Sequence, residues 1–183
     1  MKSYTIFLLG HRFVFTTDHG VFSKTGLDFG TRKLLEVIPL EKVHGDVLDV
    51  GCGYGPIGIM IAKLTDSNVM MCDVNRRALH LARMNAERNQ VDVSILESDC
   101  YQAIDGDKKF DVIITNPPIR AGKKIVYEIV MGARNHLKSD GILFLVVRKE
   151  QGAKSMISDL QEYYHVTILD KIKGFFIIQC DFN

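Results

Sequence analysis

Residues 46–58 read DVLDVGCGYGPIG, and this stretch decides the fold class. The segment 46–50 is short and apolar, like strands that are buried on both faces of a parallel sheet. Four glycines then follow within eight residues and allow a sharp turn of the backbone. A helix is predicted directly after the turn, over residues 56–64. A buried strand, a glycine turn and a helix in this order indicate an α/β protein.

The same alternation continues along the chain. Further helices are predicted over 76–89 with Asn75 as the cap, over 124–137 and over 151–163. The predicted strands are 46–50, 68–72, 93–96, 112–115, 142–147, 166–171 and 175–180. A connection as short as Lys173-Gly174 forces the last two strands to be antiparallel. The predicted fold is a doubly wound, mostly parallel, Rossmann-like α/β sheet of seven strands with an antiparallel C-terminal hairpin.

A short N-terminal extension with β character precedes this pattern. It is predicted to contain two β segments and one helix, over 4–9, 12–16 and 32–38. Thr31 is expected to cap the helix, and Pro39 to end it. The length of 183 residues corresponds to little more than one domain of about 150 residues. We therefore expect a single domain over 1–183, with an extension (1–45) and a ligand-binding core (46–183).

The composition predicts a soluble, cytoplasmic protein with no membrane contact. Hydrophobic residues make up 46% and charged residues 25%, as in ordinary globular domains. The net charge of +1 is too small to indicate a nucleic-acid partner by itself. The four cysteines show no Cys-x-x-Cys pair and no histidine at metal-ligand spacing, so no metal site is predicted. The first apolar run is interrupted by Gly10, His11 and Arg12, and is too short for a signal segment or a membrane span.

The glycine turn predicts a nucleotide-like ligand at the end of its strand. Gly53, Gly55 and Gly58 formally match the dinucleotide fingerprint, so a nicotinamide or flavin dehydrogenase has to be considered. That frame, however, begins after an additional Gly51-Cys52, and the carboxylate of Asp49 disfavours a pyrophosphate and favours a cation. S-adenosylmethionine (SAM) combines adenosine with a positive sulfonium and a positive ammonium, and it has no phosphate. SAM is therefore the predicted cofactor.

Two further carboxylates stand at the ends of the next strands. Asp73 follows Gly55 by 73 − 55 = 18 positions, close to the roughly 20 at which an acidic residue meets a ribose hydroxyl in nucleotide sites. Asp99 follows the third predicted strand, where it could accept a hydrogen bond from the adenine amino group. The adjoining Val74 and Cys100 are included as candidate cofactor contacts.

The fourth predicted strand runs directly into Asn116-Pro117-Pro118-Ile119. Two prolines fix the backbone and remove two donors, which leaves the Asn116 side-chain oxygen and the Pro117 carbonyl as rigid acceptors. Two acceptors on the hydrogens of an exocyclic amine orient its lone pair and stabilise the positive charge that develops during methylation. These four residues are the predicted catalytic motif of an N-methyltransferase.

Taken together, these motifs resemble those of class I SAM-dependent methyltransferases. The segments Gly20-Val21-Phe22-Ser23, Leu27-Asp28-x-Gly30-Thr31, 51–58 and 116–123 more narrowly resemble the methyltransferase small domain family, which includes small-subunit ribosomal RNA guanine-N2 methyltransferases. The resemblance implies guanine N2 of ribosomal RNA as the acceptor, and ribosomal RNA or the ribosomal subunit as the partner. It also implies that the glycines line the methionine part of SAM and that Phe22 lies near the cofactor. The candidate cofactor-binding residues are Phe22, Asp49, Gly51, Gly53, Tyr54, Gly55, Asp73, Val74, Asp99, Cys100 and Asn116.

Several alternatives remain at this point. Ile119 stands where many amino methylases have an aromatic that stacks on the base, so Tyr54 or Phe22 could stack instead. Arg120, Lys123 and Lys124 could contact phosphates. The acceptor could also be a protein glutamine or a DNA adenine, since the motif suits any planar amino group. A non-catalytic SAM-binding or RNA-binding module is the alternative of a different class.

Overall fold

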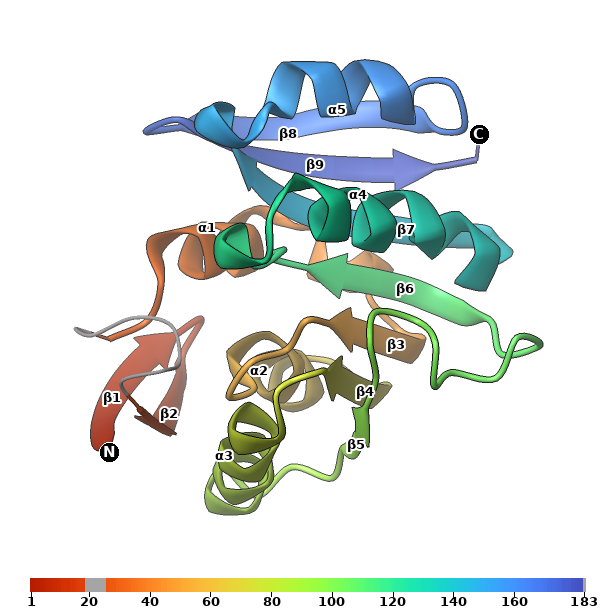
Figure 1. The fold of residues 1–183 in the computed structure, drawn as a ribbon. Coiled ribbons are helices and arrows are strands. Elements are labelled where there is room, and N and C mark those ends of the chain that lie inside the picture. Colours follow the sequence, from red (N-terminus) through yellow and green to blue (C-terminus); the bar gives the residue numbers. More distant parts are fainter. Residues whose placement is uncertain (19–25, 183) are drawn as a thin grey trace.

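The computed structural model describes residues 1–18 and 26–182, which form an α/β fold around a seven-stranded sheet. The strand order is β5-β4-β3-β6-β7-β9-β8 (Figure 1). The strands are β3 (Gly45–Val50), β4 (Ser67–Asp73), β5 (Ser94–Glu97), β6 (Phe110–Thr115), β7 (Leu137–Arg148), β8 (His165–Ile172) and β9 (Phe175–Asp181). Strands β3 to β7 run parallel, whereas β9 is antiparallel to both β7 and β8. The predicted fold class is confirmed, including the C-terminal hairpin.

Helices cover both faces of this sheet. They are α1 (Phe29–Val37), α2 (Pro56–Leu64), α3 (Arg76–Arg88), α4 (Lys123–Gly132) and α5 (Ala153–Leu160). Successive strand residues point to opposite faces, so Val47 packs in the core with α1, α2 and α3, whereas Leu48 packs in the core with α4 and α5. This arrangement explains why the strands are apolar throughout. None of the helices in the described residues is long and apolar enough to cross a membrane.

Some predicted boundaries around the last helices are wrong by several residues. Helix α4 ends at Gly132, and a 3₁₀ turn over Ala133–His136 leads into β7, which begins at Leu137. Leu137 pairs with Phe110 ahead of a register shift, so the polar residues that follow belong to the strand although their pattern resembles a loop. Helix α5 begins only after Gly152, which has a left-handed φ of 84°.

The extension forms a separate two-stranded antiparallel sheet of β1 (Lys2–Leu8) and β2 (His11–Thr17), followed by α1. The hairpin lies beside α3, at the opposite end of the molecule from β8 and β9 (Figure 1). The N-cap of α1 is Asp28, not Thr31 as predicted, because Asp28 Oδ2 accepts a hydrogen bond from the Thr31 backbone nitrogen at 3.1 Å. A carboxylate three residues ahead of that amide is among the strongest N-caps.

Asn85 of α3 joins the hairpin to the glycine turn. Its side chain is fully buried, and its Oδ1 accepts from the Thr16 backbone nitrogen at 2.8 Å. Its Nδ2 donates to the carbonyls of Thr16 at 3.0 Å and of Tyr54 at 2.8 Å. One amide thus satisfies three buried backbone groups on two segments far apart in sequence.

We expect Asn85→Ala to lower the free energy of unfolding by about 3 kcal/mol, because it leaves buried backbone groups without partners. Urea denaturation measures this change. Glu87→Ala is the matched control, since Glu87 is exposed on the same helix. Equal midpoints for the two variants would show that the three hydrogen bonds do not hold the hairpin in place.

Candidate active site

A cavity of about 340 Å³ opens at the carboxyl ends of β3, β4 and β6. From β3 the chain passes to β4 and β5 on one side and then crosses to β6 on the other side of β3, so the cavity lies at the topological switch point where α/β proteins bind ligands. Its volume is in the range of small-molecule sites, roughly 300–1,000 Å³. Its lining includes Leu27, Asp28, Thr31, Gly51, Gly53, Tyr54, Asp73, Val74, Ser98, Asp99, Cys100, Asn116, Pro117, Pro118 and Arg120.

The glycine turn and the proline motif face each other across this cavity. Gly51 has a φ of 69°, and a Cβ placed there would lie 3.4 Å from the Pro118 ring. The turn is also tied to the neighbouring strand by the Cys52 backbone nitrogen, which donates to the Cys72 carbonyl at 2.9 Å. Gly53 has a φ of 57° with nothing within 4 Å of a Cβ placed there. Gly53 therefore leaves open space at the strand end, as a ligand site requires, whereas Gly51 lets the turn lie close to Pro118.

Gly55 and Asp49, two of the predicted cofactor contacts, do not line the cavity. Gly55 has a φ of 102°, and a Cβ there would lie 2.9 Å from Ile59, so this glycine lets α2 pack closely. Asp49 is fully buried behind the turn, where its Oδ2 accepts from the Gly58 backbone nitrogen at 2.9 Å. Asp49 Oδ1 has no hydrogen-bond partner among the described residues. The structure therefore does not place Asp49 where it could contact a ligand in this cavity.

Burial raises the pKa of the Asp49 carboxyl to about 7, against the opposing effect of the Gly58 hydrogen bond. The folded protein therefore holds this proton more tightly than the unfolded chain, and stability is lost as pH rises from about 4 to about 7. We expect the wild type to lose about 2 kcal/mol relative to Asp49→Asn between pH 5 and pH 8. Urea denaturation at both pH values gives the difference. Parallel pH profiles would mean that Asp49 is ionised in the folded protein.

Asp73 and the residues beside it form one wall of the cavity. The carboxylate of Asp73 accepts from the backbone nitrogens of Gly53 at 2.8 Å and Asn75 at 2.9 Å, which fixes it at the mouth of the glycine turn. Val74 is 64% exposed although it lines the cavity, an unusual position for a branched apolar side chain. Asp99 lies exposed beside buried Ser98 on the same wall. The wall thus offers an apolar surface flanked by two carboxylates.

The side chain of Asn116 is held in one orientation by α1. Its Nδ2 donates to Asp28 Oδ2 at 2.9 Å and to Thr31 Oγ1 at 3.0 Å. A carboxylate can only accept, so the amide nitrogen must face Asp28, and the Asn116 oxygen remains available as an acceptor. Sequence reasoning did not identify Asp28 or Thr31 as site residues. The available signal was the segment Leu27-Asp28-x-Gly30-Thr31, which resembles the family but does not by itself indicate a contact with Asn116.

Some of the remaining predicted residues line the cavity with accessible groups, and others do not. Pro117 and Pro118 line the cavity, as does Cys100, whose thiol pKa is raised to about 11 by burial. Tyr54 lines it too but is only 3% exposed. Its hydroxyl is 2.7 Å from that of Tyr4 in the hairpin core. Tyr54 is therefore not free to stack on a base. Phe22 and the side chain of Ile119 lie outside the described part of the chain.

These residues fit SAM better than a dinucleotide. The described part of the cavity lining contains one cationic side chain, Arg120, and it follows the proline motif rather than the glycine turn. Carboxylates, exposed Val74 and open glycines suit a ribose, an adenine and a cationic chain. Asp73 would hold the ribose, Val74 and Asp99 the adenine, and Gly51 and Gly53 the methionine part. When bound there, SAM would supply an electrophilic methyl group.

Comparison with known proteins decides the family. The model of the methyltransferase small domain family matches residues 12–179, almost the whole chain. The chain belongs to this family. The prediction of a class I SAM-dependent methyltransferase is therefore confirmed, and the dehydrogenase alternative is not supported.

Several relatives share this small domain. "Uncharacterized protein YbxB" of Bacillus subtilis is 46% identical over 170 residues, which cover 91% of this chain and 85% of the relative. Ribosomal RNA small subunit methyltransferase C of Haemophilus influenzae is 42% identical over 132 residues, 69% of this chain and 39% of the relative. This chain thus matches only about two fifths of that longer enzyme.

The fold also matches solved structures. A 16S rRNA N2 methyltransferase of T. thermophilus, solved in complex with AdoMet and guanosine, aligns with a TM-score of 0.89 at 24% identity. The alignment covers 100% of this chain and 50% of that enzyme. A ribosomal protein L11 methylase of Lactobacillus delbrueckii aligns with a TM-score of 0.72 at 21% identity, over 84% of this chain and 79% of the other. At these identities the likeness establishes the fold.

Proposed function

We propose that this protein transfers the methyl group of SAM to the exocyclic N2 amine of a guanine in ribosomal RNA. The observation that carries the proposal is the Asn116 amide, whose two hydrogens are taken by Asp28 and Thr31. Its oxygen is thereby reserved for a donor that enters the cavity. The names of the longer relatives, which are ribosomal RNA methyltransferases, support this choice of acceptor. A cytoplasmic location with the ribosomes follows from the same proposal.

The chain's own residues would act by orientation and electrostatics. Asn116 and Pro117 would accept the two hydrogens of the amine, so that its lone pair points along the direction of transfer. The Asn116 oxygen would also stabilise the positive charge that develops on the nitrogen. The absence of a side chain at Gly51 leaves room for Pro118 on the facing motif, since a Cβ there would lie 3.4 Å from the proline ring.

Incubation with radiolabelled SAM and separate cellular RNA, DNA and protein fractions tests the acceptor. The proposal predicts label in small-subunit ribosomal RNA, and digestion to nucleosides should yield N2-methylguanosine. Label in protein would favour a glutamine acceptor, and label in DNA would favour adenine. SAM binding without transfer to any fraction would indicate a non-catalytic module.

We expect Asp73→Ala to weaken SAM binding roughly tenfold or more, because ribose hydroxyls lose a charged acceptor. The variant also loses two hydrogen bonds that order the glycine turn, which acts in the same direction. Calorimetric titration gives the dissociation constant. Asp66→Ala is the control, since Asp66 is exposed at the far end of β4. An unchanged constant for Asp73→Ala would remove Asp73 from the ribose site.

A further inference from the structure

Two aromatic rings and three cationic side chains gather where α1 meets the C-terminal hairpin. The rings of Phe29 and Phe175 lie 5.4 Å apart between centroids, at an angle of 51°. The amino groups of Lys33 and Lys173 lie 5.7 and 5.0 Å from the Phe29 ring centroid, and the Arg148 guanidinium lies 5.1 Å from that of Phe175. We call these five residues the aromatic–cation cluster.

The cations of the cluster are weakly engaged. Lys33 pairs with Glu36 at 3.2 Å and Arg148 with Glu150 at 3.5 Å, and these pairs are partly or largely solvent-exposed. Exposed ion pairs of this kind contribute little to stability. Among the described residues, Lys173 makes no ion pair and is held only over the Phe29 ring. An incoming anion could therefore bind these cations, and the free-energy cost of breaking their present contacts would be small.

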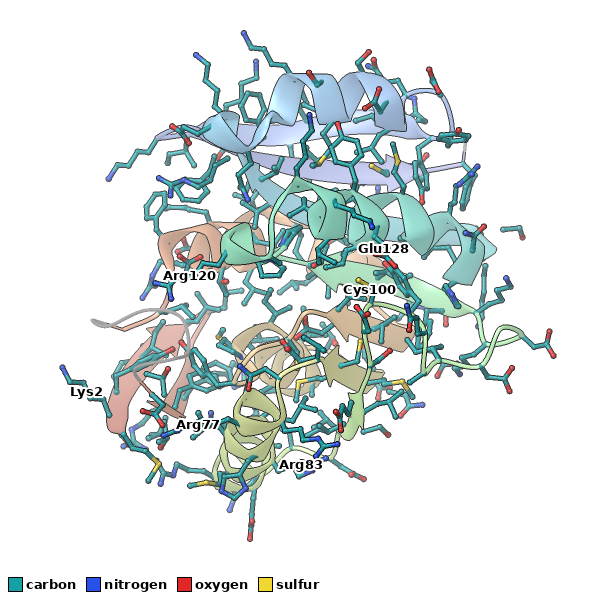
Figure 2. All side chains as sticks on the ribbon, in the orientation of Figure 1. Lys2, Arg77, Arg83, Cys100, Arg120 and Glu128 are labelled. Carbon is teal, nitrogen blue, oxygen red and sulfur yellow. The ribbon has the colours of Figure 1, made fainter. Side chains whose placement is uncertain are left out.

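The cluster borders the acceptor motif. A Cβ at Gly30 would lie 2.9 Å from the Phe175 ring, so this ring packs directly on the first turn of α1, next to Asp28. A small hollow is lined by Asp28 and Asn116 together with Arg148 and Phe175. The cluster therefore lies beside Asn116, around a hollow that is separate from the SAM cavity. Figure 2 labels Lys2 on the hairpin and Arg83 on α3, at the other end of the molecule from β8 and β9.

We propose that the aromatic–cation cluster docks the single-stranded RNA segment that flanks the target base. The inference rests on the proposed function. Phosphates would meet Lys173 and Arg148, and an unpaired neighbouring base would stack on the exposed part of Phe29 or Phe175. Aromatic rings among cations are how proteins hold single strands, because every base has a face that can stack. A paired helix presents no free base face, so the surface selects an unpaired segment.

Fluorescence anisotropy with a labelled single-stranded RNA of mixed sequence tests this surface across a salt titration. In the double variant Arg148→Gln/Lys173→Asn, binding should weaken and the slope of log Kd against log salt should fall by about 1.4, for two lost phosphate contacts. Asparagine suits the left-handed φ of 50° at position 173. Phe175→Leu should weaken binding roughly tenfold with the salt slope unchanged. Lys2→Gln/Arg83→Gln, with the same charge loss, is the control and should bind as the wild type does.

Two further measurements separate the docking surface from the proposed function. The SAM dissociation constant should be the same in all variants, and methylation of ribosomal RNA should show a raised KM with kcat nearly unchanged. If the cluster and control variants bind RNA equally, the surface is not the docking site, although methylation of RNA by the wild type still supports the function. If the wild type labels protein and binds no RNA, both proposals are overturned.

Discussion

Asn116→Ala should lower methyl-transfer turnover by on the order of a hundredfold, the loss usual for one preorganised transition-state contact. The affinity for SAM should remain close to that of the wild type, because the residues that we assign to its ribose and adenine, Asp73, Val74 and Asp99, lie at the ends of β4 and β5 and are unchanged in this variant. Stability should also change little, since Asn116 is only half-buried. Single-turnover rates with labelled SAM, together with calorimetric titration, measure the two quantities separately.

The control for this variant is Asn135→Ala, because Asn135 is exposed and lies away from the cavity. Turnover of Asn116→Ala equal to that of the control would reject Asn116 as the group that holds the amine. A parallel loss of SAM affinity would instead assign Asn116 to cofactor binding.

Asp28→Ala should reduce turnover nearly as much as Asn116→Ala, although we place Asp28 in contact with neither methyl donor nor acceptor. Asp28 fixes the Asn116 amide through a 2.9 Å hydrogen bond and caps α1 through a second bond. Removing it frees the amide to rotate and lowers stability by about 1 kcal/mol through the lost cap. Both bonds use the same oxygen, Oδ2, and Asp28→Asn keeps an oxygen that can accept them, so its stability and turnover should stay closer to wild type than those of Asp28→Ala.

A double-mutant cycle distinguishes this positioning role from a separate catalytic one. If Asp28 acts through Asn116, the double variant Asp28→Ala/Asn116→Ala should be no slower than Asn116→Ala alone. If turnover of the double variant falls by the product of the two single losses, Asp28 contributes to turnover independently of Asn116. Turnover in Asp28→Asn as low as in Asp28→Ala would mean that an acceptor oxygen at position 28 is not enough to orient the amide.

The sequence predicted the fold because its strongest signals are local. Apolar strands, the glycine turn and the short link at Lys173-Gly174 determine layers and strand direction without knowledge of distant contacts. The sequence also predicted that the candidate site residues after β3, β4 and β6 lie together. The reason is that the carboxyl ends of neighbouring parallel strands meet at one edge of the sheet.

Two properties of the site depend on contacts that the sequence does not show. Asp28 and Asn116 are 88 positions apart, so their hydrogen bond appears only after α1 packs against the sheet. Asp49 stands beside the glycines in sequence, yet it turns towards α2 because Gly58 leaves room for it there. Tyr54 is likewise drawn into the hairpin core by Tyr4.

The most direct measurement is a crystal structure of the protein with SAM or its demethylated product. We predict the ribose at Asp73, the adenine against Val74, and the sulfur facing the oxygens of Asn116 and Pro117. A ligand found outside this cavity, or bound in it with the sulfur turned away from Asn116, would contradict the account.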